Sequence, residues 1–282
     1  MIRSFLRAAG VVLLVIVLPL VLGYLLSLYL IPTPQIAVIR IEGDIWGFYT
    51  TYITEALEEV QQDPAVRGVV LEIVSPGGEV TASETLYFDV LKLREKKPVI
   101  ASVNELAASG AYYIACAADE IYAKPASGIG NVGVISFLPE PDLVDEILIT
   151  TGPFKLSGGP QMTYIRQLEM LKDSFIAAIM AQREGRLNIG PDVLSRGEIY
   201  PGLQAQQLGL IDHIGSQGDA IIAAAQMAKI RHYKIVDRTP KVPEEEFPFD
   251  LEIRKSRTAA TVAARPKHLP PGFYYRYIEP TQ

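Results

Sequence analysis

The feature that most constrains the fold is an alternation of strand and helix patterns between residues 36 and 104. The runs IAVIRIEGDI, VRGVVLEIV and PVIASVN are short, apolar and rich in β-branched residues, which is typical of buried strands in a parallel sheet. Between these runs, residues 50–63 and 79–97 space their apolar side chains near the helical period of 3.6 residues. A β-α-β-α-β order of this kind predicts an α/β domain with right-handed crossovers between parallel strands.

The pattern continues beyond residue 104 with shorter elements. ELAASGAYYIACAAD is rich in small residues and follows the third strand directly, which predicts a sharp strand-to-helix junction with the helix beginning near Ala108. DEIYAKP and GVISFLP predict short strands, and residues 163–187 predict a long amphipathic helix. Residues 198–215 and 218–230 predict a short strand, a turn, a short helix and a closing helix.

The N-terminal region predicts a membrane anchor. Residues 8–31 form a run of 24 residues without a charge, against about 20 needed for a helix to cross a bilayer. The run is longer than the apolar part of a secretory signal and lacks a good cleavage site, so we expect one retained transmembrane helix in which Pro19 is tolerated. Arg3 and Arg7 precede it and the next basic residue is Arg40, which places the N-terminus in the cytoplasm and the rest outside. The alternative is a cleaved signal peptide, which also exports the domain.

These patterns divide the chain into four parts. Residues 1–31 are the anchor, 32–35 a proline-containing linker, 36–236 the folded domain and 237–282 a C-terminal tail. The tail holds 7 of the 20 prolines and is expected to be largely irregular, because proline blocks regular elements. Its cluster of Phe273, Tyr274, Tyr275 and Tyr277 is too aromatic for a free linker. We expect this cluster to dock against a neighbouring subunit or to cover a groove.

Composition and motifs exclude several classes of function. The net charge of −6 argues against a nucleic-acid partner. One cysteine allows no intrachain disulfide, and three histidines make a metal site of several ligands improbable. The sequence contains neither H-E-x-x-H nor a phosphate-binding P-loop. Gly128–Gly133 fits G-x-G-x-x-G, but a strand-like run follows it, which indicates a turn rather than a dinucleotide site.

Two features could carry chemistry. Ser109 begins a predicted helix among small residues, so its hydroxyl and the next N–H suit a nucleophile with its own oxyanion donor. The alternative is an ordinary helix-capping serine. The sequence SPGG at 75–78 follows a buried strand, and its glycines allow backbone N–H groups to approach a developing negative charge. The alternative is a plain strand-to-helix turn.

A nucleophilic serine needs a base. The three histidines, His213, His232 and His268, are poorly placed by the predicted elements. G-x-S-x-G and S-x-x-K are absent, which disfavours the hydrolase and penicillin-recognising classes that use them. Lys155 lies in GPFKLSGGP, a turn-rich loop before the long helix, and is the candidate base. The alternative is an ordinary solvated lysine.

The combination of SPGG, AASGAYY and GPFKLSGGP, with a long helix behind it, resembles the signal peptide peptidase A family of serine peptidases. The resemblance covers residues 36–236, and EIYPGLQAQQLGLID resembles the closing segment of the family. It implies a Clp protease/crotonase-like core of repeated β-α-β units. It also implies a Ser/Lys dyad that requires no metal ion and no organic cofactor.

Carried over by motif, the resemblance makes Ser109 the nucleophile and Lys155 the general base. Gly77 and Gly78 match the turn whose backbone N–H helps to form the oxyanion hole, and Gly110 follows the nucleophile.

This chain departs from the family near its second glycine-rich turn. The family often has a lysine-orienting serine where this chain has Asn131, whose side chain can still accept a hydrogen bond. The loop before Lys155 is also short for the family. A different alignment puts Gln161 at the lysine position, and on that alignment the chain is inactive.

The resemblance also implies partners and a location. We expect a ring-like homo-oligomer at the cell membrane that cleaves hydrophobic peptides, such as signal-peptide remnants, through an acyl-enzyme. Two alternatives stay open, an inactive scaffold of the same fold and a membrane peptidase that acts on a specific partner protein. A crotonase-like acyl-CoA enzyme is disfavoured by export and by the lack of a suitably placed carboxylate.

Overall fold

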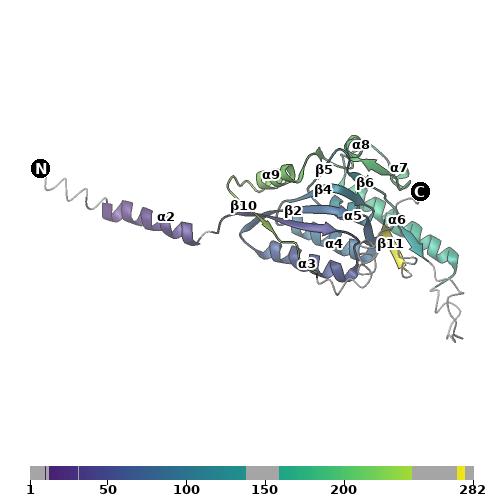
Figure 1. Ribbon diagram of the computed structural model, residues 1–282, viewed down its shortest axis with the longest axis horizontal. Coiled ribbons are helices and arrows are strands. Elements are labelled where there is room, and N and C mark those ends of the chain that lie inside the picture. Colours follow the sequence, from purple (N-terminus) through teal and green to yellow (C-terminus); the bar gives the residue numbers. More distant parts are fainter. Residues whose placement is uncertain (1–9, 11–12, 31, 138–158, 243–271, 277–282) are drawn as a thin grey trace, which may run out of the picture.

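The computed structural model describes residues 10, 13–30, 32–137, 159–242 and 272–276, and it is built around a mainly parallel β-sheet (Figure 1). The sheet has the order β10-β1-β2-β4-β5-β9, while β6 pairs with β4 and β8 pairs with β6. Its strands are β1 (Gln35–Glu42), β2 (Val66–Ser75), β4 (Val99–Ala108), β5 (Glu120–Ala123), β6 (Gly128–Gly130), β8 (Ile199–Pro201), β9 (His213–Ile214) and β10 (Lys234–Asp237). The pairing of β6 with β8 is antiparallel, and the other pairings in this sheet are parallel.

Helices connect and cover these strands. The helices of the domain are α3 (Gly47–Gln62), α4 (Val80–Arg94), α5 (Gly110–Cys116), α6 (Gln161–Gln182), α7 (Pro191–Leu194), α8 (Gly202–Gln207) and α9 (Gln217–Met227). The order β1-α3-β2-α4-β4 confirms the predicted β-α-β-α-β unit and the α/β class. A short strand that the sequence does not predict, β3 (Gly77–Glu79), lies between β2 and α4.

The two faces of the sheet carry separate apolar layers. Ile36 and Val38 of β1 pack with the alanines of α9 on one face, whereas Ile39 and Ile41 join the larger core on the other. That larger core contains buried side chains of α3, α4, α5 and α6. Successive side chains of a strand point to opposite faces, so a nearly continuous apolar strand has to be covered on both.

A second sheet lies beside the first and contains a strand from the tail. Its order is β3-β11-β7, with β11 (Gly272–Arg276) antiparallel to both β3 and β7 (Ile135–Phe137). The strand itself was not predicted, although the aromatic cluster that it contains was expected to dock. The segment GFYYR contains no proline and is rich in aromatic residues, which are compatible with a strand, but its pairing depends on the distant strands β3 and β7.

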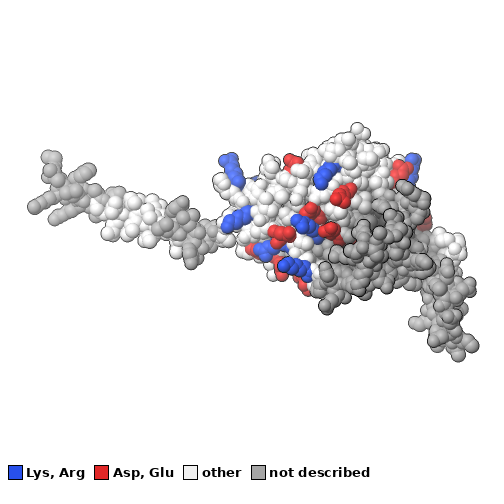
Figure 2. All heavy atoms as spheres, viewed as in Figure 1, with Lys and Arg blue, Asp and Glu red and all other residues white. Residues whose placement is uncertain are grey.

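The N-terminal segment contains the π-helix η1 (Leu13–Val17) and α2 (Leu18–Leu30), which stand clear of the sheet (Figure 1). Within the described ranges, no helix is both long enough and apolar enough to cross a membrane. The predicted transmembrane helix thus stays a prediction, and part of its span lies outside the described residues. Figure 2 shows acidic and basic side chains intermingled on the viewed face of the sheet domain, over the part of the surface that is not grey.

Candidate active site

Ser109 stands at the junction between β4 and α5 in an unusual backbone conformation. Its φ of 53° and ψ of −122° lie outside the regions that non-glycine residues ordinarily adopt. The Ser109 N–H donates to the carbonyl oxygen of Gly130 at 2.7 Å, and the Ser109 carbonyl accepts from the Tyr113 N–H at 3.0 Å. Bonds to both sides of the residue hold this conformation, which costs about 1–3 kcal/mol.

The hydroxyl of Ser109 does not cap the helix. Ser109 occupies the position before the first residue of α5, but its side chain makes no capping hydrogen bond. A capping residue normally has extended backbone angles, which Ser109 lacks. The fully buried Ala108 and Ala111 pack the turn on either side of it. The helix-cap explanation therefore fails, and strain of this kind is typical of functional positions.

The SPGG turn lies next to this junction. Ser75, the last residue of β2, is in register with Ala107 near the end of β4. The carboxyl ends of these parallel strands therefore meet at one edge, and α5 contacts β3, which begins within the SPGG turn. The structure thus brings Gly77 and Gly78 to the side of the sheet where Ser109 and Gly110 lie.

Ser75 stabilises the turn through hydrogen bonds of its side chain, a role that the sequence did not reveal. Its Oγ donates to the Gly43 carbonyl at 2.6 Å and accepts from the Gly77 N–H at 3.1 Å. Gly77 has a φ of 93°, in the region that favours glycine. The available signal was a serine two residues before a glycine, a pattern in which the hydroxyl bonds the backbone of a turn.

Gly78 is enclosed by the backbone of Ile45. The Ile45 N–H donates to the Gly77 carbonyl at 3.0 Å, and the Glu79 N–H donates to the Ile45 carbonyl at 2.9 Å. A Cβ on Gly78 would lie 2.1 Å from the Ile45 carbonyl oxygen, so only glycine fits. Peptide groups alternate in direction along a strand. The Gly77 carbonyl and the Glu79 N–H both point to Ile45. The N–H of Gly78 therefore points to the opposite edge of β3.

Gly110 supplies the second backbone donor of the candidate site. It is the first residue of α5, and the first N–H groups of a helix have no acceptor within that helix. Ser109, Gly110 and Gly78 are thus the candidate hydroxyl and the two candidate backbone donors at this edge of the sheet. Such a group suits attack on a carbonyl and stabilisation of the oxyanion that results.

Asn131 follows Gly130, the residue that accepts the Ser109 N–H. Its φ is 52°, its Nδ2 donates to the Gly197 carbonyl at 2.8 Å, and its N–H donates to the Glu198 carbonyl at 2.8 Å. The side-chain nitrogen therefore fastens two loops together, and Oδ1 is the atom that can accept from an amine. The sequence indicated a turn at Gly128–Gly133 and a possible lysine-orienting role for Asn131, but it did not reveal that Gly130 positions Ser109.

The residues considered as a base are placed as follows. Lys155 lies outside the described residues, and Gln161 is the exposed first residue of α6. His213 lies on the edge strand β9, where its Nε2 is 3.4 Å from Glu120 Oε2. His232 is exposed beside β10, at the opposite edge of the sheet. Both described histidines are thus remote from Ser109.

In the described ranges, no group of three or more His, Cys, Asp or Glu is arranged to hold a metal ion.

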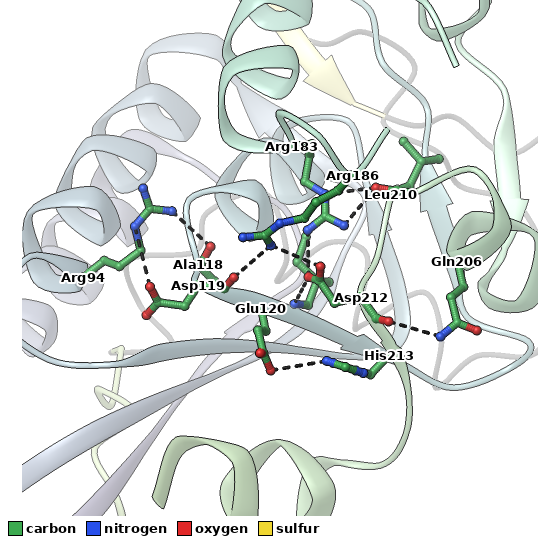
Figure 3. Close-up of polar contacts among 12 residues, drawn as sticks. Arg94, Ala118, Asp119, Glu120, Arg183, Arg186, Gln206, Leu210, Asp212 and His213 are labelled. Carbon is green, nitrogen blue, oxygen red and sulfur yellow. Dashed lines mark hydrogen bonds and ion pairs between the residues drawn. The ribbon is translucent and has the colours of Figure 1, made fainter. Parts of the chain in front are cut away.

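The end of α6 is anchored by a buried ion pair (Figure 3). Arg183 is 1% exposed, and it donates to Asp212 Oδ2 at 2.7 Å and to the Gly209 carbonyl at 3.0 and 2.8 Å. Asp212 also accepts from the Ile121 N–H and from Arg186. Burial acts to raise the pKa of Asp212, but these hydrogen bonds and the arginine charges hold it below its usual value. The cluster fixes the helix that follows the segment of Lys155.

The α/β fold, with a strained serine beside glycine N–H groups, defines a protein of the serine-hydrolase class. Comparison with known proteins identifies the family within that class. The model of peptidase family S49 matches residues 92–143, which include Ser109 and Asn131. A protein of Synechocystis, provisionally named as a protease, is 30% identical over 220 residues, which cover 71% of this chain and 77% of that one. The chain therefore belongs to peptidase family S49, the signal peptide peptidase A family of serine peptidases, as the resemblance in its sequence predicts.

Two other relatives show how much of a longer protein is shared. A protein of Methanocaldococcus jannaschii, also provisionally named as a protease, is 32% identical over 201 residues, or 66% of this chain and 64% of that one. The chloroplastic serine protease SPPA of Arabidopsis thaliana is 28% identical over 221 residues, or 70% of this chain and 33% of that one. The chain therefore spans between about a third and two thirds of the length of these two relatives.

Proposed function

We propose that this chain is a serine endopeptidase in which Ser109 is the nucleophile and Lys155 the general base. The observation that carries the proposal is the conformation of Ser109, with a φ of 53° and a hydroxyl that does not cap α5. A non-glycine residue held in such strain, next to two backbone donors, is hard to explain by folding alone. Family membership supports the same reaction.

In the first step, the Ser109 Oγ attacks the carbonyl carbon of a peptide bond and its proton passes to the Nζ of Lys155. Lys155 has to be neutral to accept this proton. A free lysine has a pKa of about 10.4, and an efficient base at neutral pH needs about 7–8. The difference of about 3 units corresponds to about 4 kcal/mol. Burial in an apolar groove with bound substrate is able to disfavour the ammonium form by that amount.

The negative charge that develops on the carbonyl oxygen is stabilised by the N–H groups of Gly78 and Gly110. Gly77 contributes through its backbone conformation, because its own N–H is bonded to Ser75 Oγ. One oxyanion donor is typically worth about 10²–10³ in rate. Lys155 protonates the leaving amine, and the acyl-enzyme on Ser109 is then hydrolysed by water with Lys155 again as the base.

The substrates proposed are hydrophobic peptides such as signal-peptide remnants. The uncharged run at residues 8–31 supports this choice, since a retained anchor holds the catalytic domain at the bilayer surface, outside the cytoplasm, where such peptides emerge. Asn131 orients Lys155 through its Oδ1. The assembly proposed is a homo-oligomeric ring, and the reaction needs no cofactor.

The proposal is tested with a fluorophosphonate probe and a hydrophobic reporter peptide on the full chain in detergent. Labelling and cleavage should both be lost in Ser109→Ala and in Lys155→Ala, and both should persist in the control Lys124→Ala, which changes an exposed lysine. Loss in Ser109→Ala alone would keep the nucleophile and reject Lys155 as the base. A folded parent chain that neither labels nor cleaves would favour the inactive scaffold.

A further inference from the structure

A cavity of about 350 Å³ lies at the amino-terminal edge of the sheet. It is formed where β2 and β4 begin and α9 ends, at the edge opposite to the one where Ser109 follows β4. Its volume falls in the range of small-molecule sites. Three basic side chains line it, those of Arg67, Lys96 and Lys97, and none of the described residues that line it is acidic. The cavity therefore has the charge of a site for an anion.

These three cations lack carboxylate partners. Within the part of the chain that the structure describes, none of them forms an ion pair. The Nζ of Lys97 donates instead to the backbone carbonyls of Val60 and Asp63, at the end of α3. The carboxylate of Asp63 is paired with Arg238 at 2.9 Å. The positive charge of the cavity is thus not neutralised by an adjacent carboxylate.

Arg67 and Lys96 keep hydrogen-bond donors for a ligand. Both are exposed, and the side chain of Arg67 makes no hydrogen bond to another described residue. The Nζ of Lys96 donates to Gln61 Oε1 at 3.0 Å, which uses one of its three N–H groups. A guanidinium group matches a phosphate with two parallel hydrogen bonds, and an ammonium group adds a third.

The electrostatics of the cavity favour the same ligand. Burial lowers the pKa of Lys97, and the positive charges of Arg67 and Lys96 lower it further, against the opposing effect of Asp63. The three cations are therefore close enough to repel one another. A bound anion relieves this repulsion, because an opposite charge favours the charged form of each group.

The course of the chain indicates where the anion comes from. Gln35, the first residue of β1, is in register with Val66 in the wall of the cavity, and its N–H donates to the Ala65 carbonyl at 2.8 Å. The linker at residues 32–35 therefore joins the domain about 4.8 Å, one strand spacing, from that wall. Figure 1 shows the N-terminal segment leaving the domain at this end, and Figure 2 shows basic side chains there.

Exposed apolar side chains accompany the cations at this end of the domain. Met227, the last residue of α9, is 41% exposed and directly precedes Ala228, which lines the cavity. Ile235 of the edge strand β10 is 58% exposed. Basic and apolar side chains together are typical of surfaces that lie in the headgroup region of a bilayer. A lipid can contact both kinds of side chain, whereas a free phosphate uses only the cations.

We propose that this cavity binds the phosphate of an anionic phospholipid, with Arg67 and Lys96 as its ligands. The site lies at the other edge of the sheet from Ser109 and is additional to the proposed peptidase reaction. The choice of a lipid rests on the anchor proposed for residues 8–31, which would hold this edge of the domain at the bilayer. The recognition of a phosphate does not depend on that anchor.

The inference is tested by titrating the full chain, in a neutral detergent, with a short-chain phosphatidylglycerol. Phosphatidylcholine of the same chain length and inorganic phosphate serve as competitors of different chemistry. Phosphatidylglycerol should bind at least about tenfold more tightly than either one. Equal affinity for the two lipids would overturn the inference, because the cations would then not select an anionic lipid. Equal affinity for inorganic phosphate would overturn the assignment to a lipid.

A double variant tests the two ligands. Arg67→Gln combined with Lys96→Gln should weaken phosphatidylglycerol binding at least about tenfold, because it removes the charged donors. The control combines Lys124→Gln with Arg166→Gln, which removes the same charge from exposed positions that do not line the cavity. The control should stay within about twofold, since distant exposed charges are screened. Equal weakening in both double variants would overturn the site, because binding would then depend on net charge alone.

A second variant keeps the ligands and changes the wall of the cavity. Ala228→Glu places a carboxylate there and should abolish phosphatidylglycerol binding, whereas Ala228→Gln adds a neutral side chain of the same size and should bind more tightly than Ala228→Glu by at least about tenfold. Thermal unfolding without lipid checks that all variants fold. Folded Ala228→Glu that binds as well as Ala228→Gln would overturn the inference.

Separate readouts distinguish this inference from the proposed function. Fluorophosphonate labelling of Ser109 should persist in every variant of the cavity. A parent chain that binds phosphatidylglycerol but is not labelled would contradict the proposed reaction alone, and a labelled parent that binds no phosphatidylglycerol would contradict the inference alone. Release of the chain from membranes by alkaline carbonate would contradict the anchor, and with it the choice of a lipid, while the titration in detergent still tests the recognition of phosphate.

Discussion

The backbone nitrogen of Ser109 donates to the carbonyl oxygen of Gly130 at 2.7 Å. This bond joins the end of β4 to β6, where Ala108 and Gly130 are in register. Gly130 has a φ of 112°, and a Cβ there would lie 2.9 Å from the Glu198 carbonyl oxygen. The strained serine is therefore held by a neighbour that is itself restricted to glycine, so the position of the candidate nucleophile depends on backbone geometry.

Gly78→Ala should abolish labelling and destabilise the chain by several kcal/mol. The new Cβ would meet the Ile45 carbonyl oxygen at 2.1 Å, which forces the SPGG turn away from its place beside Ser109. The matched control is Gly133→Ala, because a Cβ at Gly133 has nothing within 4 Å among the described residues. The control should change stability by less than about 1 kcal/mol. Thermal unfolding and probe labelling provide the measurements, and a stable, fully labelled Gly78→Ala chain would contradict the site as described.

Two buried serines, one with and one without hydrogen-bond partners, allow a second comparison between a variant and its control. Ser75→Ala should cost about 1–3 kcal/mol and slow labelling, because the Gly43 carbonyl and the Gly77 N–H lose the hydroxyl that joins them. Ser83 is also buried, but its Oγ has no hydrogen-bond partner within the described part of the chain. Ser83→Ala should therefore be neutral or slightly stabilising. Urea unfolding of both variants measures the two changes in unfolding free energy. An equal loss of unfolding free energy in both would mean that the Ser75 hydrogen bonds do not stabilise the turn.

The sequence was sufficient to predict the helices and strands that have a hydrophobic pattern along the chain. The β-branched runs and helical spacing of residues 36–104 predicted β1, α3, β2, α4 and β4, and small residues around Ser109 predicted the junction. These predictions succeeded because hydrophobic periodicity is read along the chain.

What the sequence did not reveal depends on contacts between distant segments. The roles of Gly130 and Ser75 arise from hydrogen bonds to residues 21 and 32 positions away. The aromatic cluster of the tail indicated that the tail docks, but strand pairing with β3 and β7 has no local signature. The enclosure of Gly78 by Ile45 likewise appears only when the two backbones are placed side by side.

The single cysteine should be inert in the folded chain. Cys116 is fully buried in α5, and burial raises the pKa of its thiol to about 12. The thiolate is the reactive form, so at pH 8 iodoacetamide should not alkylate the native chain. Alkylation should become stoichiometric in denaturant, which makes the residue a probe of unfolding. Rapid alkylation of the native chain would show that α5 opens easily, and Ser109 would then not be held as described.

The final prediction concerns the pair that anchors α6. Asp212→Asn should cost about 3–5 kcal/mol of unfolding free energy at pH 7, because it leaves the buried Arg183 without its carboxylate. The control, Glu169→Gln, changes a carboxylate that is 61% exposed and pairs with Lys172, and it should cost less than about 1 kcal/mol.

The same pair predicts a pH dependence with a definite sign. The fold lowers the pKa of Asp212, so its contribution is fully present above the unfolded value of about 3.9 and is lost as the pH falls through the lower folded value. The difference in unfolding free energy between parent and Asp212→Asn should therefore shrink below about pH 4, as measured by urea unfolding at pH 7 and pH 3. A difference that is equally large at both values would mean that the charge of Asp212 is not what holds Arg183, and that the anchor of α6 rests on the hydrogen bonds to the Gly209 carbonyl.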